Sequence, residues 1–310
     1  TTLFRSMGLS VSNGAKITLD DSGSTIRTSG EGSHAITIVG DNSEAMLNNL
    51  TVSTEGEIAS AVLFSSNAKG TIDGGSYTAT GEGSYGVEIL NGADLTIKNA
   101  TITTSGYGMA RAIVNRYATL SLENVNINTT GDFGNAGIYN DGELTGSNVT
   151  ITTTGSQSFG IQNYTNTFNL AASHVETYGE QSVGIMNTGR AELTDTHIVT
   201  QGKNADAISS DGAKSTFVLN NGSTIASGEN SRAVAMTHGG ALEANSTDIT
   251  SEQSAAIALE SASSATVTHS NVSGSNVAFS FSGGKNVATI DGGSITATAS
   301  GGSAFAVDSG

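Results

Sequence analysis

The chain has 310 residues, a formal net charge of −16 and no cysteine, proline or tryptophan. Hydrophobic residues make up 36% of it and 40 residues are glycine, so the apolar side chains suffice only for a narrow core shared along a repeat. The negative charge argues against binding to nucleic acid or to an anionic membrane, because like charges repel. We recognise no membrane-spanning run and no signal peptide, and the lack of cysteine excludes disulfides and thiolate metal sites.

One pattern recurs along the whole chain: a small residue followed by a β-branched or aromatic one. The twelve pairs stand about 24.5 residues apart on average and are Ala35-Ile36, Ala61-Val62, Gly86-Val87, Ala112-Ile113, Gly137-Ile138, Gly160-Ile161, Gly184-Ile185, Ala207-Ile208, Ala233-Val234, Ala256-Ile257, Ala278-Phe279 and Ala304-Phe305. Apolar residues alternate with period two, which is typical of strands and not of helices. The repeat predicts an all-β, right-handed, three-stranded parallel β-helix of about twelve rungs, a single domain over 1–310 on the order of 50 Å long.

In chain order within each rung, the first predicted strand has an inward leucine or isoleucine. These residues are Leu19, Leu47, Ile72, Ile97, Leu122, Leu170 and Leu219. A polar column marks the turn that follows, at Asn49, Asn99, Asn124, Asn148, Ser173, Thr196 and Asn221. Asparagine tolerates the left-handed backbone conformation and its amide can bond the amide of the next rung, so we expect a ladder of stacked side chains.

The second predicted strand has an inward apolar residue four positions before a glycine. The apolar residues are Ile26, Val52, Tyr77, Ile102, Ile127, Ile151, Val175 and Ile198. Inward threonines on this strand predict a hydroxyl ladder, at Thr28, Thr54, Thr104, Thr129, Thr153, Thr177 and Thr200. The glycines are expected to adopt positive φ at the next corner, at Gly30, Gly56, Gly81, Gly106, Gly131, Gly155, Gly179 and Gly202.

Carboxylates gather at this corner. They are Glu31, Glu55, Glu57, Glu82, Asp132, Glu180, Glu229 and Glu252. Adjacent rungs would bring such residues to roughly 5 Å from one another. We interpret them as a solvated edge that confers solubility, with weak Ca²⁺ binding as the alternative; no other cofactor is expected.

On the third predicted strand, an inward apolar column is interrupted by Asn115, Asn140, Asn163 and Asn187. We favour a buried amide ladder, satisfied from rung to rung, over a polar channel or buried water. The outward positions of the same strand have large side chains on six consecutive rungs: Leu63, Leu90, Val114, Arg116, Tyr139, Asp141, Gln162, Tyr164 and Met186. The later rungs have only small residues, Ser209, Ala235, Ala258, Ser280 and Ala306. This contrast predicts a partner-binding surface, with a bland solvent-exposed face as the alternative.

Parallel β-helices also include polysaccharide-cleaving enzymes, which require clustered carboxylates. The one adjacent aspartate pair is Asp20-Asp21, and neighbouring residues in a strand point to opposite faces. The five histidines, His34, His174, His197, His238 and His269, are not clustered, although His174 and His197 occupy equivalent positions one rung apart. We therefore expect no catalytic, cofactor or metal site. A polysaccharide lyase or hydrolase is the alternative function. An ice-binding solenoid with outward Thr103 and Thr152 is a third.

The segments GNAGIYNDG, QSFGIQNYT and QSVGIMNTG, at 134–142, 157–165 and 181–189, each follow a TxxxG turn. They resemble the passenger domains of type V autotransporters, in the pertactin-like and self-associating adhesin branch of Gram-negative bacteria. The resemblance is one of pattern and extends over the whole chain. It implies a cysteine-poor stalk exported to the bacterial cell surface, where it acts as an adhesin or autoaggregation module. The implied partners are a host extracellular-matrix protein, a glycan, or a like molecule on a neighbouring cell, and we expect the chain to be a fragment of a longer passenger.

Overall fold

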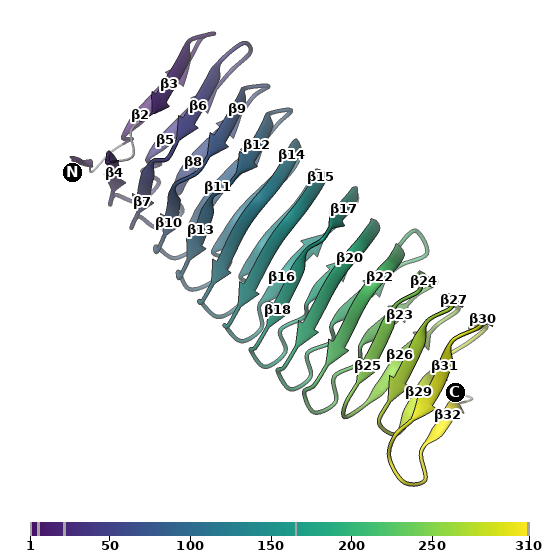
Figure 1. Cartoon of the computed structure of the whole chain (residues 1–310). Coiled ribbons are helices and arrows are strands. Elements are labelled where there is room, and N and C mark those ends of the chain that lie inside the picture. The colour runs from purple at the N-terminus through teal and green to yellow at the C-terminus, as the bar shows by residue number, and fades with distance from the viewer. Residues whose placement is uncertain (1, 5–6, 21–22, 165, 309–310) are drawn as a thin grey trace. The chain divides into compact units, whose positions relative to one another are not determined.

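The computed structural model describes residues 2–4, 7–20, 23–164 and 166–308, which form strands and turns (Figure 1). These residues contain no helix, and so none that could cross a membrane. Strands of successive rungs pair in parallel, strand upon strand, in three columns. The fold is a right-handed parallel β-helix of about twelve rungs, as the periodicity predicts. The chain divides into two compact units, 1–158 and 159–310, which are described in turn.

The three columns correspond to the first, second and third strands of a rung, and the first described strand of unit 1 belongs to the second column. The first column consists of β3 (Lys16–Asp20), β6 (Glu44–Asn48), β9 (Lys69–Asp73), β12 (Asp94–Lys98) and the middle parts of β14 (Arg111–Thr129) and β15 (Ala136–Thr153). The second column consists of β1 (Thr2–Phe4), β4 (Thr25–Thr28), β7 (Thr51–Thr54), β10 (Ser76–Ala79), β13 (Thr101–Thr104) and the ends of β14 and β15. The third column consists of β2 (Leu9–Ser12), β5 (Ile36–Val39), β8 (Ser60–Ser65), β11 (Tyr85–Leu90) and the starts of β14 and β15.

Unit 2 has the same three columns. The third column consists of β16 (Phe159–Asn163), β19 (Ile185–Asn187), β21 (Ile208–Asp211), β23 (Val234–Thr237), β26 (Ala255–Glu260), β29 (Val277–Ser282) and β32 (Ser303–Asp308). The first column consists of β17 (Thr167–Ala171), the starts of β20 (Arg190–Thr200) and β22 (Thr216–Ala226), β24 (Ala241–Asn245), β27 (Ser264–Thr268) and β30 (Val287–Asp291). The second column consists of β18 (His174–Thr177), the ends of β20 and β22, β25 (Asp248–Ser251), β28 (Asn271–Gly274) and β31 (Ser294–Ala297).

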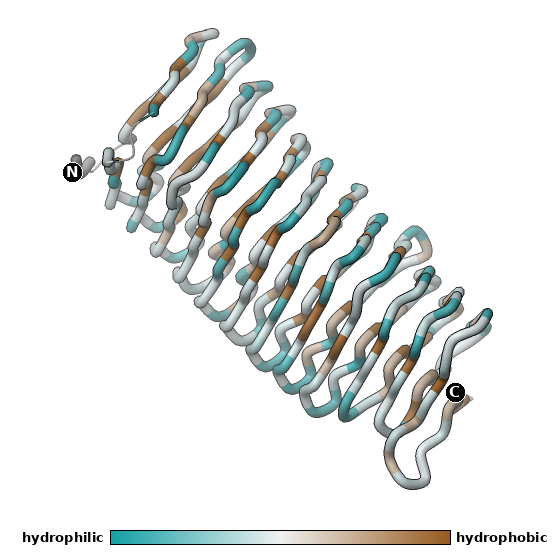
Figure 2. The backbone as a smooth tube through the Cα atoms, in the orientation of Figure 1, coloured by the Kyte–Doolittle hydropathy of each residue, from teal (hydrophilic) through white to brown (hydrophobic). Residues whose placement is uncertain are grey.

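The core of each unit is a narrow interior of alternate residues from the three columns. The predicted register is confirmed: Ile36 pairs with Val62, Val87 pairs with Ile113, and both pairs are buried. Figure 2 shows the most hydrophobic residues spaced along the strands, with paler or hydrophilic residues between them. In the last described rung, Phe305 and Val307 follow the inward alternation but are 49% and 78% exposed.

The corner after the first column has a left-handed residue in most rungs, as predicted for Asn49, Asn99, Asn124, Asn148 and Asn221. The amide ladder is also present: Nδ2 of Asn148 donates to Oδ1 of Asn124 at 2.7 Å, and Nδ2 of Asn124 donates to Oδ1 of Asn99 at 3.1 Å.

The prediction was wrong by one residue in two rungs of unit 2. There the left-handed residues are Ala172 and Asp195, while the predicted Ser173 and Thr196 are buried. The hydroxyls of Ser173 and Thr196 donate to the carbonyl groups two residues earlier, at 2.8 and 3.1 Å, so they close the corner without occupying its left-handed position.

The glycines that end the second column do not adopt positive φ, contrary to the prediction. At this corner of unit 1 the positive φ values fall two or three residues later, for example at Gly32, Ile58 and Met109. The glycines are needed for a different reason, which is close approach of the rungs. A Cβ atom at Gly106 would lie 1.9 Å from the carbonyl oxygen of Gly81, and no real Cβ can approach so closely.

The second-column threonines point inward as predicted, but most do not form a hydroxyl ladder. Oγ1 of Thr28 donates to the carbonyl of Ser33 at 2.6 Å, and Oγ1 of Thr200 donates to the carbonyl of Ala205 at 2.7 Å. Thr129 and Thr153 do contact each other, at 2.8 Å. Because a buried hydroxyl needs an acceptor, the nearby corner carbonyl of the same rung competes with the next threonine.

Candidate partner-binding surface

The outward side chains of the third column form a flat face in unit 1, which we call the third face. In its central column Thr37 pairs with Leu63, Leu63 with Glu88, Glu88 with Val114, and Val114 with Tyr139. In the next column Leu90 pairs with Arg116 and Arg116 with Asp141. The predicted residues of unit 1 therefore do share one face, in two parallel columns.

The ring of Tyr139 contacts two arginines on this face. The guanidinium carbons of Arg111 and Arg116 lie 4.2 and 4.9 Å from the centroid of its ring, within the range of cation–π contacts. Val114 stands on the same strand between these arginines and pairs with Tyr139 in the next rung. Val114 is fully buried, so the prediction that it is exposed was wrong. The long side chains of Arg111, Arg116 and Tyr139 lie near Val114 and exclude solvent from it.

Glu88 occupies the third face between Leu63 and Val114, a place that sequence reasoning had not identified. Only 8% of Glu88 is exposed, and its Oε2 accepts a hydrogen bond from Oγ of Ser60 at 2.6 Å. The backbone N–H of Ser60 donates to Nδ1 of His34 at 2.9 Å. Burial lowers the pKa of His34, and the Glu88 carboxylate opposes this shift. A polar, partly desolvated cluster therefore adjoins the leucines of the third face.

The remaining predicted residues lie in unit 2, where Gln162 pairs with Met186. Tyr164 and Met186 are half-buried. Gln162 is 6% exposed, so the prediction of an exposed side chain was wrong for it as well. The long side chain of Met186 stands one strand spacing away, about 4.8 Å, and limits the solvent that reaches Gln162.

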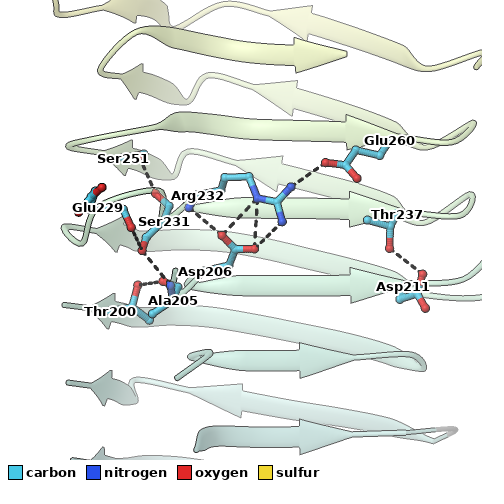
Figure 3. A network of polar contacts seen from close by, with 10 residues as sticks. All are labelled: Thr200, Ala205, Asp206, Asp211, Glu229, Ser231, Arg232, Thr237, Ser251 and Glu260. Atoms are coloured by element: carbon cyan, nitrogen blue, oxygen red, sulfur yellow. Dashed lines mark hydrogen bonds and ion pairs between the residues drawn. The ribbon is translucent and has the colours of Figure 1, made fainter. Parts of the chain in front are cut away.

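The small outward residues of the later rungs make room for an arginine network (Figure 3). Nη2 of Arg232 lies 2.7 Å from Oδ2 of Asp206 in the preceding rung, and Nη1 lies 2.7 Å from Oε1 of Glu260 in the following rung. Ala235 and Ala258 are outward-facing and yet 0% and 3% exposed. Arg232 therefore links carboxylates of the rungs on either side of its own.

The acidic corner is partly paired with basic residues. Arg27 forms an ion pair with Glu55, and Nζ of Lys203 lies 2.9 Å from Oε2 of Glu229. Oδ1 of Asp132 accepts a hydrogen bond from the backbone N–H of Ser156 at 2.6 Å. In the part of the chain that the structure describes, no group of three or more His, Cys, Asp or Glu side chains is placed to hold a metal ion.

The other titratable pairs singled out in the sequence are separate from the third face. His174 pairs with His197 in adjacent strands, as predicted. Nε2 of His174 lies 3.5 Å from Oε2 of Glu176, and Nδ1 of His197 lies 2.8 Å from Oγ of Ser223. Asp20 is exposed at the end of β3, and Asp21 lies outside the described residues.

No protein-family model matches the chain, and no curated protein sequence matches it. Among solved structures, the chain is similar to Vag8 in the cryo-EM structure of the Vag8–C1 inhibitor complex. The match covers 100% of this chain and 98% of that chain, with a TM-score of 0.69 and 16% sequence identity. The chain is similar to Vag8 in its parallel β-helix fold. Vag8 is an autotransporter passenger domain, so the fold fits the resemblance noted in the sequence, and at this identity the likeness concerns the fold alone.

Proposed function

We propose that the chain is a passenger-type adhesin, displayed outside a bacterial cell, that binds a host protein through the third face of unit 1. The observation that carries this proposal is the contact of the Tyr139 ring with the guanidinium groups of both Arg111 and Arg116. Tyrosine and arginine are the residues over-represented at binding hot spots. Contacts that restrain a ring in the free chain reduce the conformational entropy it loses when a partner covers it. The complex of Vag8 with C1 inhibitor supports a protein as the class of partner.

The surroundings of Tyr139 suit a protein interface. Leu63 and Leu90 are half-buried and supply apolar area, while Arg116 and Asp141 lie in adjacent rungs and supply charges of both signs. Interfaces of this kind combine an apolar centre with a polar rim. We therefore expect binding that is partly apolar and that weakens at high salt.

The net charge of −16 favours a foreign partner over a second copy of the chain, because two copies repel each other. A matrix protein is the partner that this proposal prefers. A glycan and self-association between cells are the competing outcomes. A glycan array and an aggregation assay with cells that display the chain distinguish these two from a protein ligand.

The test is a screen of the purified chain against extracellular-matrix and plasma proteins, repeated with the variant Leu63→Ser/Leu90→Ser/Tyr139→Ser. We expect the variant to keep its β circular dichroism and to lose about tenfold or more in affinity for any ligand found, as hot-spot truncation does. The matched control Met46→Ser/Tyr178→Ser removes exposed apolar area elsewhere, since these side chains are 50% and 43% exposed. Equal affinity of variant and parent would contradict the proposal. A second variant, Tyr164→Ser/Met186→Ser, tests the predicted residues of unit 2 separately.

A further inference from the structure

Three bulky apolar residues of unit 1 adopt left-handed backbone conformations at the corner between the second and third columns. They are Ile58 with φ 52°, Met109 with φ 58° and Phe133 with φ 65°. Large L-residues rarely adopt this conformation, because Cβ crowds the backbone, and a β-branched residue such as Ile58 is a clear outlier. Elsewhere the corner uses glycine or asparagine, which tolerate positive φ better, at Gly32, Gly83, Asn204 and Asn230, or a polar glutamine, at Gln157 and Gln181.

These three side chains are not part of the core. Ile58 is 63% exposed, Met109 is 61% exposed and Phe133 is 47% exposed. Tyr107, which is 55% exposed, contacts Phe133 with ring centroids 5.2 Å apart and a tilt of 52°. Neither backbone preference nor core packing accounts for large apolar residues in these places. Local strain combined with apolar exposure is typical of a surface that contacts another molecule.

The corners of successive rungs are joined so that these residues form one surface, which we call the apolar ridge (Ile58, Tyr107, Met109 and Phe133). The N–H of Ile58 donates to the carbonyl of Glu82 at 2.9 Å, that of Gly83 to the carbonyl of Tyr107 at 3.1 Å, and that of Met109 to the carbonyl of Phe133 at 3.0 Å. Gly83 follows Ile58 in the stack, and a Cβ there would lie 3.8 Å from Cγ1 of Ile58. Ile58 therefore lies beside a residue without a side chain, in the rung between it and Tyr107.

Carboxylates flank the apolar ridge. Glu57 and Asp132 directly precede Ile58 and Phe133, and Glu82 lies in the rung between Ile58 and Tyr107; all three are exposed. Among the described residues, neither Glu57 nor Glu82 forms an ion pair, whereas nearby Glu55 is paired with Arg27. The charge next to the apolar side chains is therefore available to a partner.

We propose that the apolar ridge binds a protein segment that presents both basic and apolar side chains. The unpaired carboxylates select the basic groups, and the ridge side chains cover the apolar ones. The same carboxylates, with the net charge of −16, repel an anionic membrane and a second copy of the chain. The ridge residues differ from those of the third face, so this inference does not depend on the proposed function.

The test uses the whole chain and a short synthetic peptide of alternating leucine and lysine, with binding followed by fluorescence anisotropy. The variant Ile58→Gly/Met109→Gly/Phe133→Gly should lose about tenfold or more in affinity for the peptide. Its Tm should be equal to or above that of the parent, because glycine accepts positive φ without strain. The matched control Gln157→Gly changes a polar, exposed residue with φ 52° at the same corner, and it should bind the peptide like the parent.

Counterparts of the peptide with serine in place of leucine, or glutamate in place of lysine, should not bind. The inference is overturned if the ridge variant binds like the parent, or if the serine peptide binds as well as the leucine peptide. A fall in Tm of the ridge variant would show that these residues stabilise the corner, and would also overturn it. The inference is also overturned if the parent does not bind the peptide but binds phosphatidylcholine vesicles, or forms dimers in sedimentation, in a way that the ridge variant abolishes. The Leu63→Ser/Leu90→Ser/Tyr139→Ser variant should bind the peptide unchanged, which separates this result from the third face.

Discussion

Nδ2 of Asn163 donates a hydrogen bond to Oδ1 of Asn187 at 2.8 Å, and neither side chain is exposed to solvent. Nδ2 of Asn187 donates in turn to the carbonyl of Gly189 at 2.9 Å and to Oγ of Ser210 at 3.1 Å. In unit 1, Nδ2 of Asn115 donates to Oδ1 of Asn140 at 2.7 Å. The interruption of the apolar column is therefore a buried amide ladder in each unit, as the sequence predicts. Such groups tolerate burial because their hydrogen bonds replace those lost to water.

The first prediction concerns this ladder. Asn187→Leu removes the acceptor of Asn163 and the donor to the carbonyl of Gly189 inside a dry core. We expect a loss of about 1–3 kcal/mol in the free energy of unfolding, measured with urea. Asn169→Leu, at an exposed position of β17, should change it by less than about 0.5 kcal/mol. Equal stability of the Asn187 variant and the parent would contradict the buried ladder.

The second prediction separates the two explanations of the corner glycines. Gly106→Ala places a Cβ 1.9 Å from the carbonyl oxygen of Gly81, so the rungs must move apart, and we expect a loss of about 3 kcal/mol or more. In Gly32→Ala the new Cβ would have no atom within 4 Å. This variant should lose only about 1–2 kcal/mol, from the strain of an alanine at φ 60°. Chemical denaturation of both variants shows which substitution lowers the free energy of unfolding more. A greater loss for Gly32→Ala would mean that conformation and not packing governs these corners.

The third prediction concerns the arginine network of unit 2. Arg232→Ala removes the partner of Asp206 and Glu260. Because the Arg232 and Asp206 side chains are only 30% and 13% exposed, we expect a loss of about 1–2 kcal/mol. Lys203→Ala breaks the exposed pair with Glu229 and should lower the free energy of unfolding much less, because solvent screens that pair. Similar losses in both variants would show that the Arg232 network is only a surface ion pair.

The fourth prediction is a pH dependence of stability that arises from His34. Burial holds the pKa of His34 in the folded chain below its ordinary value of 6.5. The unfolded chain therefore takes up the proton first as the pH falls, and the folded state loses stability as the pH drops through about 6.5. In His34→Gln, which keeps a hydrogen-bond acceptor near Ser60, this decline should be smaller between neutral pH and about pH 5. Urea unfolding across this range measures it, and identical pH profiles would exclude His34 as the cause.

The inward positions could be predicted from the sequence because stacking forces equivalent residues of successive rungs into one column. Ile113 and Ile138 pair for this reason, and so do Asn115 and Asn140. The structural role of a residue within its own rung was harder to predict than the column to which it belongs. Gly106 is visible as a repeated glycine, but only the approach of the Gly81 carbonyl shows that it is needed for packing and not for positive φ.

The outward positions were predicted less well, because long side chains can lie along the face. Alternation places Val114 outside, yet Arg111 and Arg116 extend over Tyr139 in the next rung and leave no valine surface exposed. One signal for the arginine network was available. Asp206 and Glu260 stand 26 and 28 residues from Arg232, close to one repeat length in each direction.

The central claim, that the third face binds a protein partner, is tested most directly by hydroxyl-radical footprinting of the chain alone and with its protein ligand bound. The oxidation rates of Leu63, Leu90 and Tyr139 should fall on binding, because the partner covers their side chains. Met46, which is 50% exposed on the outward side of the first column, should react at an unchanged rate and serves as the internal control. Unchanged rates at Leu63, Leu90 and Tyr139, with protection elsewhere on the chain, would contradict the account.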